Sequence, residues 1–166
     1  MKKSIMLSIP LAFALGSICS GAASANNILI NSGFESGSAG WVGTALNYFG
    51  YNCSQSNFPA IDGQCFALFT YASGTSLTQH NKIPRSGYYQ ASVALMGTGN
   101  VRFGIWAFCP GAAPSSYGFG SVNLTNSWQT LKVKTGYLNG CEVKWELYID
   151  SDSLVLVDAA RLYETF

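Results

Sequence analysis

Two stretches of alternating sequence, residues 101–109 and 142–150, carry the side chains best suited to chemistry. In each stretch one set of alternate positions is apolar and the other set is polar or aromatic. Because successive side chains of a strand point to opposite faces, each stretch predicts a strand with one buried face and one outward face. An outward ring beside charged side chains can stack on the C–H face of a sugar and hydrogen-bond its hydroxyls. The candidate side chains are Arg102, Trp106, Lys144, Glu146 and Tyr148.

Two further groups of residues, each with at least one tyrosine, extend this candidate set. Tyr88 and Gln90 occupy the polar positions of another alternating stretch, residues 88–96, and join the same face if the three strands share one sheet. Tyr48 and Tyr51 lie in the irregular segment 43–63 and form a second candidate platform. For three of the candidate rings a role other than ligand binding stays open. Trp106 could be buried under a loop, and Tyr88 and Tyr148 could be ordinary cross-strand pairs.

The sequence holds few residues that could catalyse a reaction. His80 is the only histidine, and no nucleophile motif accompanies it, so a Ser-His-Asp type of triad is not expected. Glu146 and Asp150 lie four residues apart on one strand face, about 13 Å by strand rise. That separation exceeds the spacing of the paired carboxylates in glycosidases. We therefore expect a protein that is not an enzyme.

The first 25 residues are typical of a secretory signal peptide. Lys2 and Lys3 precede a mostly apolar run, and the small residues Ala23, Ser24 and Ala25 form a cleavage signature. The apolar run is shorter than the roughly 20 residues of a membrane-spanning helix. We expect residues 26–166 to form one exported domain. The protein would be extracellular, or periplasmic if it is retained.

Charge excludes two classes of partner. Without Lys2 and Lys3 the nine basic residues become seven, against eight acidic ones, so the formal net charge is −1. Nucleic acids and anionic membranes require a basic face, so neither nucleic-acid binding nor membrane insertion is expected.

Cysteine usage agrees with export. Four cysteines follow the signal peptide, with no CxxC pair among them, which favours disulfides over a zinc site. We favour Cys53 with Cys65 and Cys109 with Cys141, because each pair then clips a loop to a neighbouring strand. The other two pairings stay open.

Eight or nine short strands are expected, with turn signals about every ten residues. No segment has a helical period over ten or more residues, so the fold class is all-β. A Pro, Gly and Ser loop is expected at residues 110–120. The expected strands span residues 28–30, 64–70, 75–83, 88–96, 101–109, 121–124, 128–135, 142–150 and 154–163.

Four motifs resemble the carbohydrate-binding modules of the jelly-roll, galactose-binding-like kind, and one of them is residues 126–129 (NSWQ), which look like their approach to a later strand. The opening stretch 27–41 has the order Asn-x-Gly-Phe-Glu, a small-residue loop and Gly-Trp. Residues 87–92 (GYYQAS) look like the central strand of these modules, and residues 156–163 (LVDAARLY) look like their closing strand. The resemblance implies a two-sheet antiparallel β-sandwich, a jelly roll, that binds a glycan or polysaccharide.

The same resemblance implies a structural calcium near the two chain ends. The candidate ligands are Glu35 and Asp158, whose carboxylates suit a hard cation that prefers oxygen. Ala159 stands where the family often has a second acid. The alternative is that both carboxylates accept backbone N–H bonds at strand ends.

These observations predict a secreted, non-catalytic carbohydrate-binding protein that is lectin-like or adhesive. A second hypothesis is an extracellular structural or surface-assembly subunit of a matrix or filament, which contacts itself or a host surface protein. A third is a small secreted hydrolase.

Overall fold

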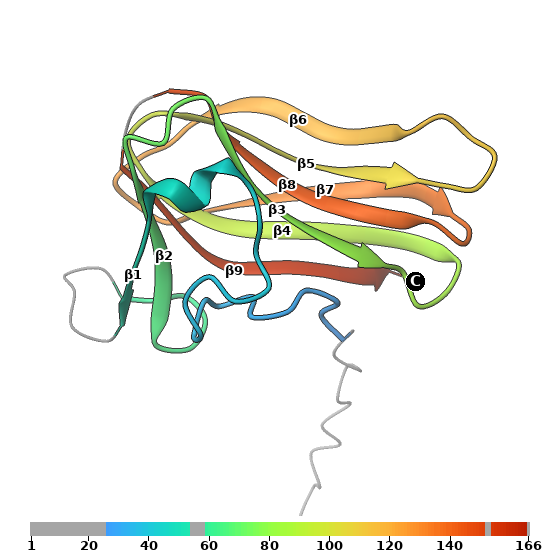
Figure 1. Cartoon of the computed structure of the whole chain (residues 1–166), viewed down its shortest axis with the longest axis horizontal. Helices are drawn as coiled ribbons and strands as arrows, with labels where there is room; N and C mark the ends of the chain where they lie inside the picture. Colours follow the sequence, from blue (N-terminus) through green and yellow to red (C-terminus); the bar gives the residue numbers. More distant parts are fainter. Residues whose placement is uncertain (1–25, 54–58, 152–153, 166) are drawn as a thin grey trace, which may run out of the picture.

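Antiparallel strands form almost all of the regular structure (Figure 1). The computed structural model describes residues 26–53, 59–151 and 154–165, so the expected signal peptide at 1–25 lies outside the described residues. The elements are η1 (Thr44–Tyr48), β1 (Phe49–Cys53), β2 (Cys65–Thr70), β3 (Thr75–Lys82), β4 (Gly87–Gly97), β5 (Asn100–Phe108), β6 (Ser115–Asn123), β7 (Gln129–Leu138), β8 (Glu142–Ile149) and β9 (Leu154–Thr165).

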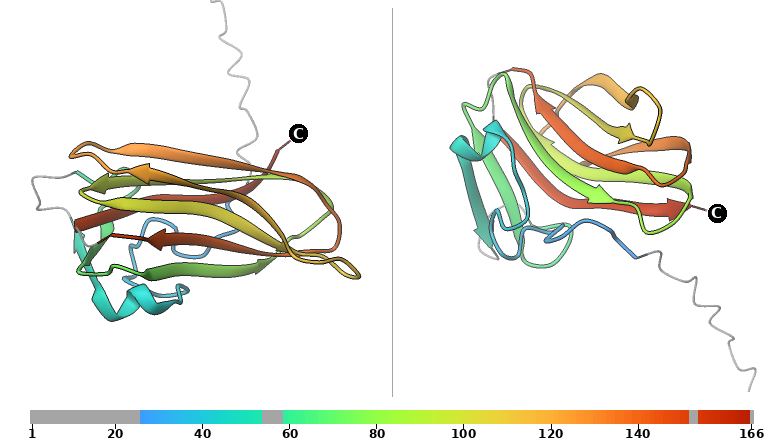
Figure 2. Two further views of the ribbon diagram at one scale, coloured as in Figure 1. Left: turned by 90° about the horizontal axis from the view of Figure 1, so that it is seen from above. Right: turned by 45° about the vertical axis from the view of Figure 1, so that its right-hand side comes forward.

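The strands form two sheets that face each other, as the two views of Figure 2 show. One sheet has five strands in the order β1-β2-β9-β4-β7, and the other has four in the order β3-β8-β5-β6. All the paired strands run antiparallel. The predicted fold class, an all-β two-sheet sandwich, is therefore confirmed. Among the described residues, no helix has the length and apolar character needed to span a bilayer.

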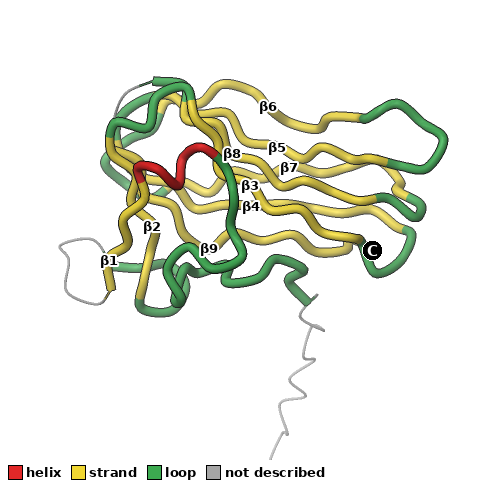
Figure 3. Tube along the Cα trace, viewed as in Figure 1, coloured by secondary structure: helices red, strands yellow, loops and turns green. Residues whose placement is uncertain are grey.

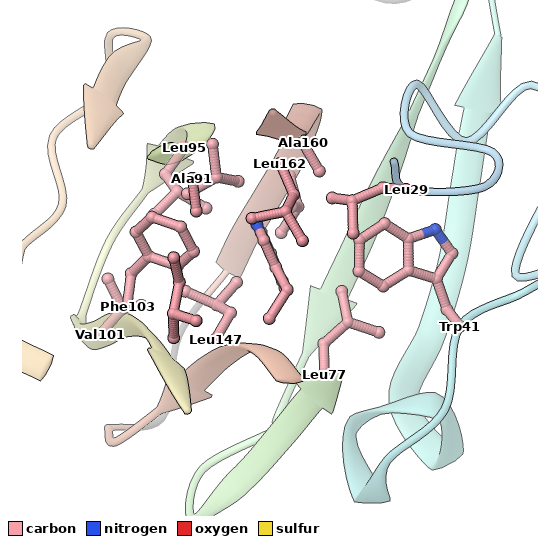
Figure 4. Packing of buried hydrophobic residues seen from close by; sticks show 14 of the residues in the cluster. Leu29, Trp41, Leu77, Ala91, Leu95, Val101, Phe103, Leu147, Ala160 and Leu162 are labelled. Atoms are coloured by element: carbon pink, nitrogen blue, oxygen red, sulfur yellow. The ribbon is translucent and has the colours of Figure 1, made fainter. Parts of the chain in front are cut away.

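The apolar positions of the alternating strands meet between the sheets and form the core (Figure 4). Trp145 of β8 is fully buried and packs against Phe103 of β5 and against Trp41, with ring centroids 5.0 Å apart in both pairs. Trp41 and Phe34 come from the segment before η1, are buried, and stack on each other at one side of this core. Trp128 packs against Phe66 in a second, smaller cluster.

The expected first strand at residues 28–30 is wrong, because this segment is irregular and appears as loop in Figure 3. Side chains take the place of a strand ladder: the Gln79 side chain accepts from the Ile30 N–H and donates to its carbonyl. Asn31 then has a φ of 49°, which ends any extended course. The segment still lies beside β9, because the Ile28 N–H donates to the Leu162 carbonyl.

The expected loop at residues 110–120 is also partly wrong, because β6 begins at Ser115. Its register with β5 slips by one residue between Arg102 and Gly104, so β6 carries one extra residue there. Gly118 and Phe119 hold this bulge with φ values of 86° and 63°. Glycine and serine in this segment suit a bulged strand as well as a loop.

Both disulfides form with the favoured pairing, Cys53 with Cys65 and Cys109 with Cys141. Cys53 and Cys65 lie directly opposite each other on β1 and β2. The second bridge joins the end of β5 to the start of β8, across a sequence separation of 32 residues. Each bridge therefore links two neighbouring strands of the same sheet, β1 with β2 and β5 with β8.

Candidate functional site

The outward side of β5 and β8 carries the candidate residues, and we call it the β5–β8 face. The register places Arg102 opposite Tyr148, Gly104 opposite Glu146, and Trp106 opposite Lys144. The inward neighbours of these residues are core side chains, so alternation alone points them outward. The structure thus brings together five of the predicted residues: Arg102, Trp106, Lys144, Glu146 and Tyr148.

Glu146 organises this face. The residue is 3% exposed. Oxygen Oε2 accepts from Trp106 Nε1 at 2.8 Å and from Lys144 Nζ at 2.8 Å. Burial, followed by hydrogen bonding with Glu146, raises the pKa of Tyr148, which keeps its hydroxyl protonated. A buried carboxylate needs such partners, so Glu146 fixes the orientation of the surrounding side chains.

Phe119 adds a third ring to the face. Its ring centroid lies 5.4 Å from that of Trp106 and 5.8 Å from that of Tyr148. The bulge in β6 makes this possible, since Phe119 would otherwise point inward with Tyr117, two residues before it. A side chain on Gly104 would collide with the Phe119 ring, because an added Cβ would lie 2.7 Å from it.

Cations flank the rings on this face. Arg102 holds Asp150 through two bonds, Nε to Oδ2 at 2.8 Å and Nη2 to Oδ1 at 2.7 Å. The guanidinium carbon also lies 4.8 Å from the centre of the Tyr148 ring, and Lys144 Nζ lies 5.7 Å from that of Trp106. Trp106 is partly exposed and is not buried under a loop. The neighbouring cation favours one position of its ring.

Two aromatic residues of this side escaped the prediction, Phe108 and Phe119. Phe108 follows Trp106 at the next outward position and is 38% exposed. It stacks with His80 of β3, with centroids 6.4 Å apart and an interplanar angle of 19°. The alternation in β5 already marked Phe108 as outward. Phe119 had a weaker signal, the alternation of aromatic residues with glycine at 117–120.

Tyr88 and Gln90 do not belong to the β5–β8 face. Their strand, β4, lies between β9 and β7 in the five-stranded sheet. Both residues are therefore on the outer side of that sheet, on the opposite side of the sandwich from the β5–β8 face. Gln90 Nε2 donates to the Tyr163 hydroxyl, and Tyr88 packs edge-on against Tyr137. The expectation of one shared face was wrong for these two residues. Alternation assigns a residue to one side of its strand, but it leaves the choice of sheet open.

Tyr48 and Tyr51 lie apart from that face, at the end of η1 and in β1. Both are exposed, and Tyr51 stacks on Phe49 with centroids 6.2 Å apart. Their role as a second platform stays a prediction.

Glu35 and Asp158 accept backbone N–H bonds, the alternative role that the sequence left open. Glu35 Oε1 accepts from the amides of residues 64 and 65, both at 2.8 Å. Asp158 Oδ2 accepts from residues 61 and 62, and its Oδ1 accepts from Ala159. Within the described ranges, no group of three His, Cys, Asp or Glu side chains is placed to hold a metal ion. Calcium at this turn stays a prediction.

A calcium ion bridging Glu35 and Asp158 predicts that a chelator lowers the melting temperature of the protein, by mass action. The loss of stability would be about 3 kcal/mol if calcium had been present at 100 times its Kd. The Asp158→Ala variant should melt at the same temperature with and without chelator. Thermal denaturation followed by circular dichroism measures both. Identical curves for the unaltered protein would leave only the hydrogen-bonding role.

Solved structures share this arrangement of strands. The carbohydrate-binding module TmCBM61, in complex with β-1,4-galactotriose, is 17% identical, with a TM-score of 0.68 over 85% of this chain and 100% of that chain. The xylan-binding domain CBM22-1 of Paenibacillus barcinonensis Xyn10C is 14% identical, with a TM-score of 0.58 over 86% of this chain and 98% of that chain. The fold is that of the jelly-roll carbohydrate-binding modules.

The same fold also occurs in proteins with other roles. A cyclase from Fischerella sp. TAU is 16% identical, with a TM-score of 0.59 over 84% of this chain and 96% of that chain. At these identities a likeness establishes the fold, and function has to come from the site. No protein-family model and no curated protein sequence matches the chain.

Proposed function

We propose that the protein is a secreted, non-catalytic glycan-binding protein and that the β5–β8 face contacts the glycan. The observation that carries the proposal is the cluster of Trp106, Phe119 and Tyr148 on one sheet face, with charged side chains directly beside the rings. Aromatic rings offer apolar surface to sugar C–H groups, and the adjacent cations and carboxylates offer hydrogen bonds to the hydroxyls. The jelly-roll likeness supports this class of ligand.

The carboxylates of the face support binding rather than hydrolysis. Glu146 is engaged by Trp106 and Lys144, and Asp150 is engaged by Arg102. Glu142 and Asp150 each lie four residues from Glu146 along the chain, about 13 Å by strand rise. Glycosidases place their two carboxylates closer together than this. Both disulfides are compatible with an oxidising, extracellular location.

Trp106→Ala is expected to weaken glycan binding about tenfold or more, because stacking on an aromatic ring contributes roughly 1 to 2 kcal/mol. A glycan-array screen of the mature protein, with and without chelator, first identifies the ligand. Titration calorimetry with that ligand then compares the variants. The substitution also removes a donor from buried Glu146 at a cost of about 1 to 3 kcal/mol, so binding is measured well below the melting temperature.

Tyr71→Ala is the matched control, since Tyr71 is an exposed ring in the turn between β2 and β3. It should leave the affinity unchanged. If Trp106→Ala folds and binds the glycan as well as the unaltered protein does, the β5–β8 face is not the site. The loop platform of Tyr48 and Tyr51 would then be tested next.

The assembly hypothesis makes a different prediction. A matrix or filament subunit should gain mass with increasing concentration in light scattering without added glycan. A glycan-binding protein should stay small and respond only to sugar.

A further inference from the structure

The opposite side of the sandwich also presents aromatic rings beside cations. On the outer side of β4 and β7, Tyr88 lies opposite Tyr137, Gln90 lies opposite Lys134, and Ser92 lies opposite Lys132. We call this surface the β4–β7 face. Tyr88 is 53% exposed and Tyr137 is 61% exposed, with ring centroids 5.6 Å apart. Two large exposed rings thus lie on a sheet face next to two lysines, Lys132 and Lys134.

The two faces differ in how their charges are balanced. On the β5–β8 face, Arg102 and Lys144 each hold a carboxylate. On the β4–β7 face, Lys132 and Lys134 are exposed, and neither takes part in an ion pair among the described residues.

The two carboxylates of β9, the strand beside β4, are already engaged elsewhere, and Glu164 is one of them, since it pairs with Arg85. Arg161 of β9 lies opposite Ser92, and it contacts Asp62 at 3.6 Å. Asp158 is buried, and its oxygens accept backbone N–H bonds. The β4–β7 face is therefore locally basic, although the formal net charge of the chain is close to zero.

We propose that the β4–β7 face binds an acidic polysaccharide, namely a polymer of uronic acids. Each uronic acid carries a carboxylate on the same ring as its apolar C–H surface. The lysines would pair with successive carboxylates, while Tyr88 and Tyr137 would stack on the sugar rings. Lys132 and Lys134 are two residues apart on one strand face, about 7 Å, so both can reach one extended chain. The proposal stands independently of the β5–β8 face.

The test uses polygalacturonic acid and its fully methyl-esterified form, which keeps the sugar backbone and removes the charge. Titration calorimetry of the mature protein should detect the acid and find the ester at least tenfold weaker. The double variant Lys132→Gln/Lys134→Gln should lose about tenfold in affinity for the acid, since exposed charge pairs contribute modestly and add. Tyr137→Ala should lose affinity as well. Raising the salt concentration should weaken the binding.

The matched control is Lys82→Gln, which removes an exposed lysine from β3 in the other sheet. It should bind the acid normally. Equal losses in the control and the double variant would show a general charge effect and overturn the proposal. Equal affinity for DNA or dextran sulfate would do the same, as would no detectable binding of the acid.

Trp106→Ala separates this proposal from the proposed function. If that variant loses the polyuronate while Lys132→Gln/Lys134→Gln keeps it, the acid binds the β5–β8 face and the present inference is wrong. If only the double variant loses the acid, the inference holds, whatever ligand the other face takes.

Discussion

Removal of both disulfides is expected to lower the free energy of unfolding by about 7 kcal/mol. In the chain-entropy model the bridge between Cys53 and Cys65 contributes about 3 kcal/mol and the bridge between Cys109 and Cys141 about 4 kcal/mol. The second contribution is larger because that bridge spans 32 residues, against 12 for the first. Such a loss is comparable to the whole stability of many domains. Urea denaturation with and without reductant measures it.

Paired alanine variants separate the two bridges. Cys109→Ala/Cys141→Ala should shift the urea midpoint further than Cys53→Ala/Cys65→Ala does. This comparison remains possible if the fully reduced protein does not fold. Midpoints that are unchanged by reductant in the unaltered protein would contradict the bridging itself.

Trp145→Ala is expected to cost about 3 to 5 kcal/mol of folding free energy, because it empties a fully buried position. The ring fills the space between Trp41 and Phe103, which contact it from different elements. Its indole N–H has no hydrogen-bond partner among the described residues, so the loss comes from packing alone. Chemical denaturation of the variant, with the disulfides intact, measures the change.

Trp106→Ala serves as the comparison for Trp145→Ala, since the two tryptophans point to opposite sides of neighbouring strands. It should cost clearly less, and Trp145→Phe should fall between the two. A larger loss for Trp106 than for Trp145 would mean that the two faces of the sheet are assigned backwards.

Most of the fold could be predicted because the alternation in the sequence is strong. The stretches that became β4, β5 and β8 have apolar residues at every second position. Burial follows that pattern closely in β5 and β8, whereas in β4 every residue except Tyr88 is buried. The prediction of a strand at residues 28–30 was wrong. A short apolar run does not show whether its backbone groups hydrogen-bond to another strand or to a side chain such as that of Gln79. That choice depends on a residue 49 positions away in the chain.

The candidate site could be predicted only in part, for a related reason. Trp106, Glu146 and Tyr148 were found from their own strands, which turned out to be neighbours. Tyr88 was misplaced because strand order is a long-range property, set by how the two sheets pack. Phe119 was missed because one extra residue reverses the direction of every later side chain in a strand, and no composition signal marks the position of that residue.

The contact between Gly104 and Phe119 has a consequence for how this protein can change over evolution. A Cβ added at position 104 would lie 2.5 Å from the Tyr117 carbonyl oxygen and 2.7 Å from the Phe119 ring, so the bulge and its ring require glycine there. The two positions are therefore coupled: a relative that replaces the glycine must also move the bulged backbone of β6, and that bulge is what turns Phe119 outward. Paired substitution at these two sites should accordingly mark the lineages in which this surface has acquired a different shape.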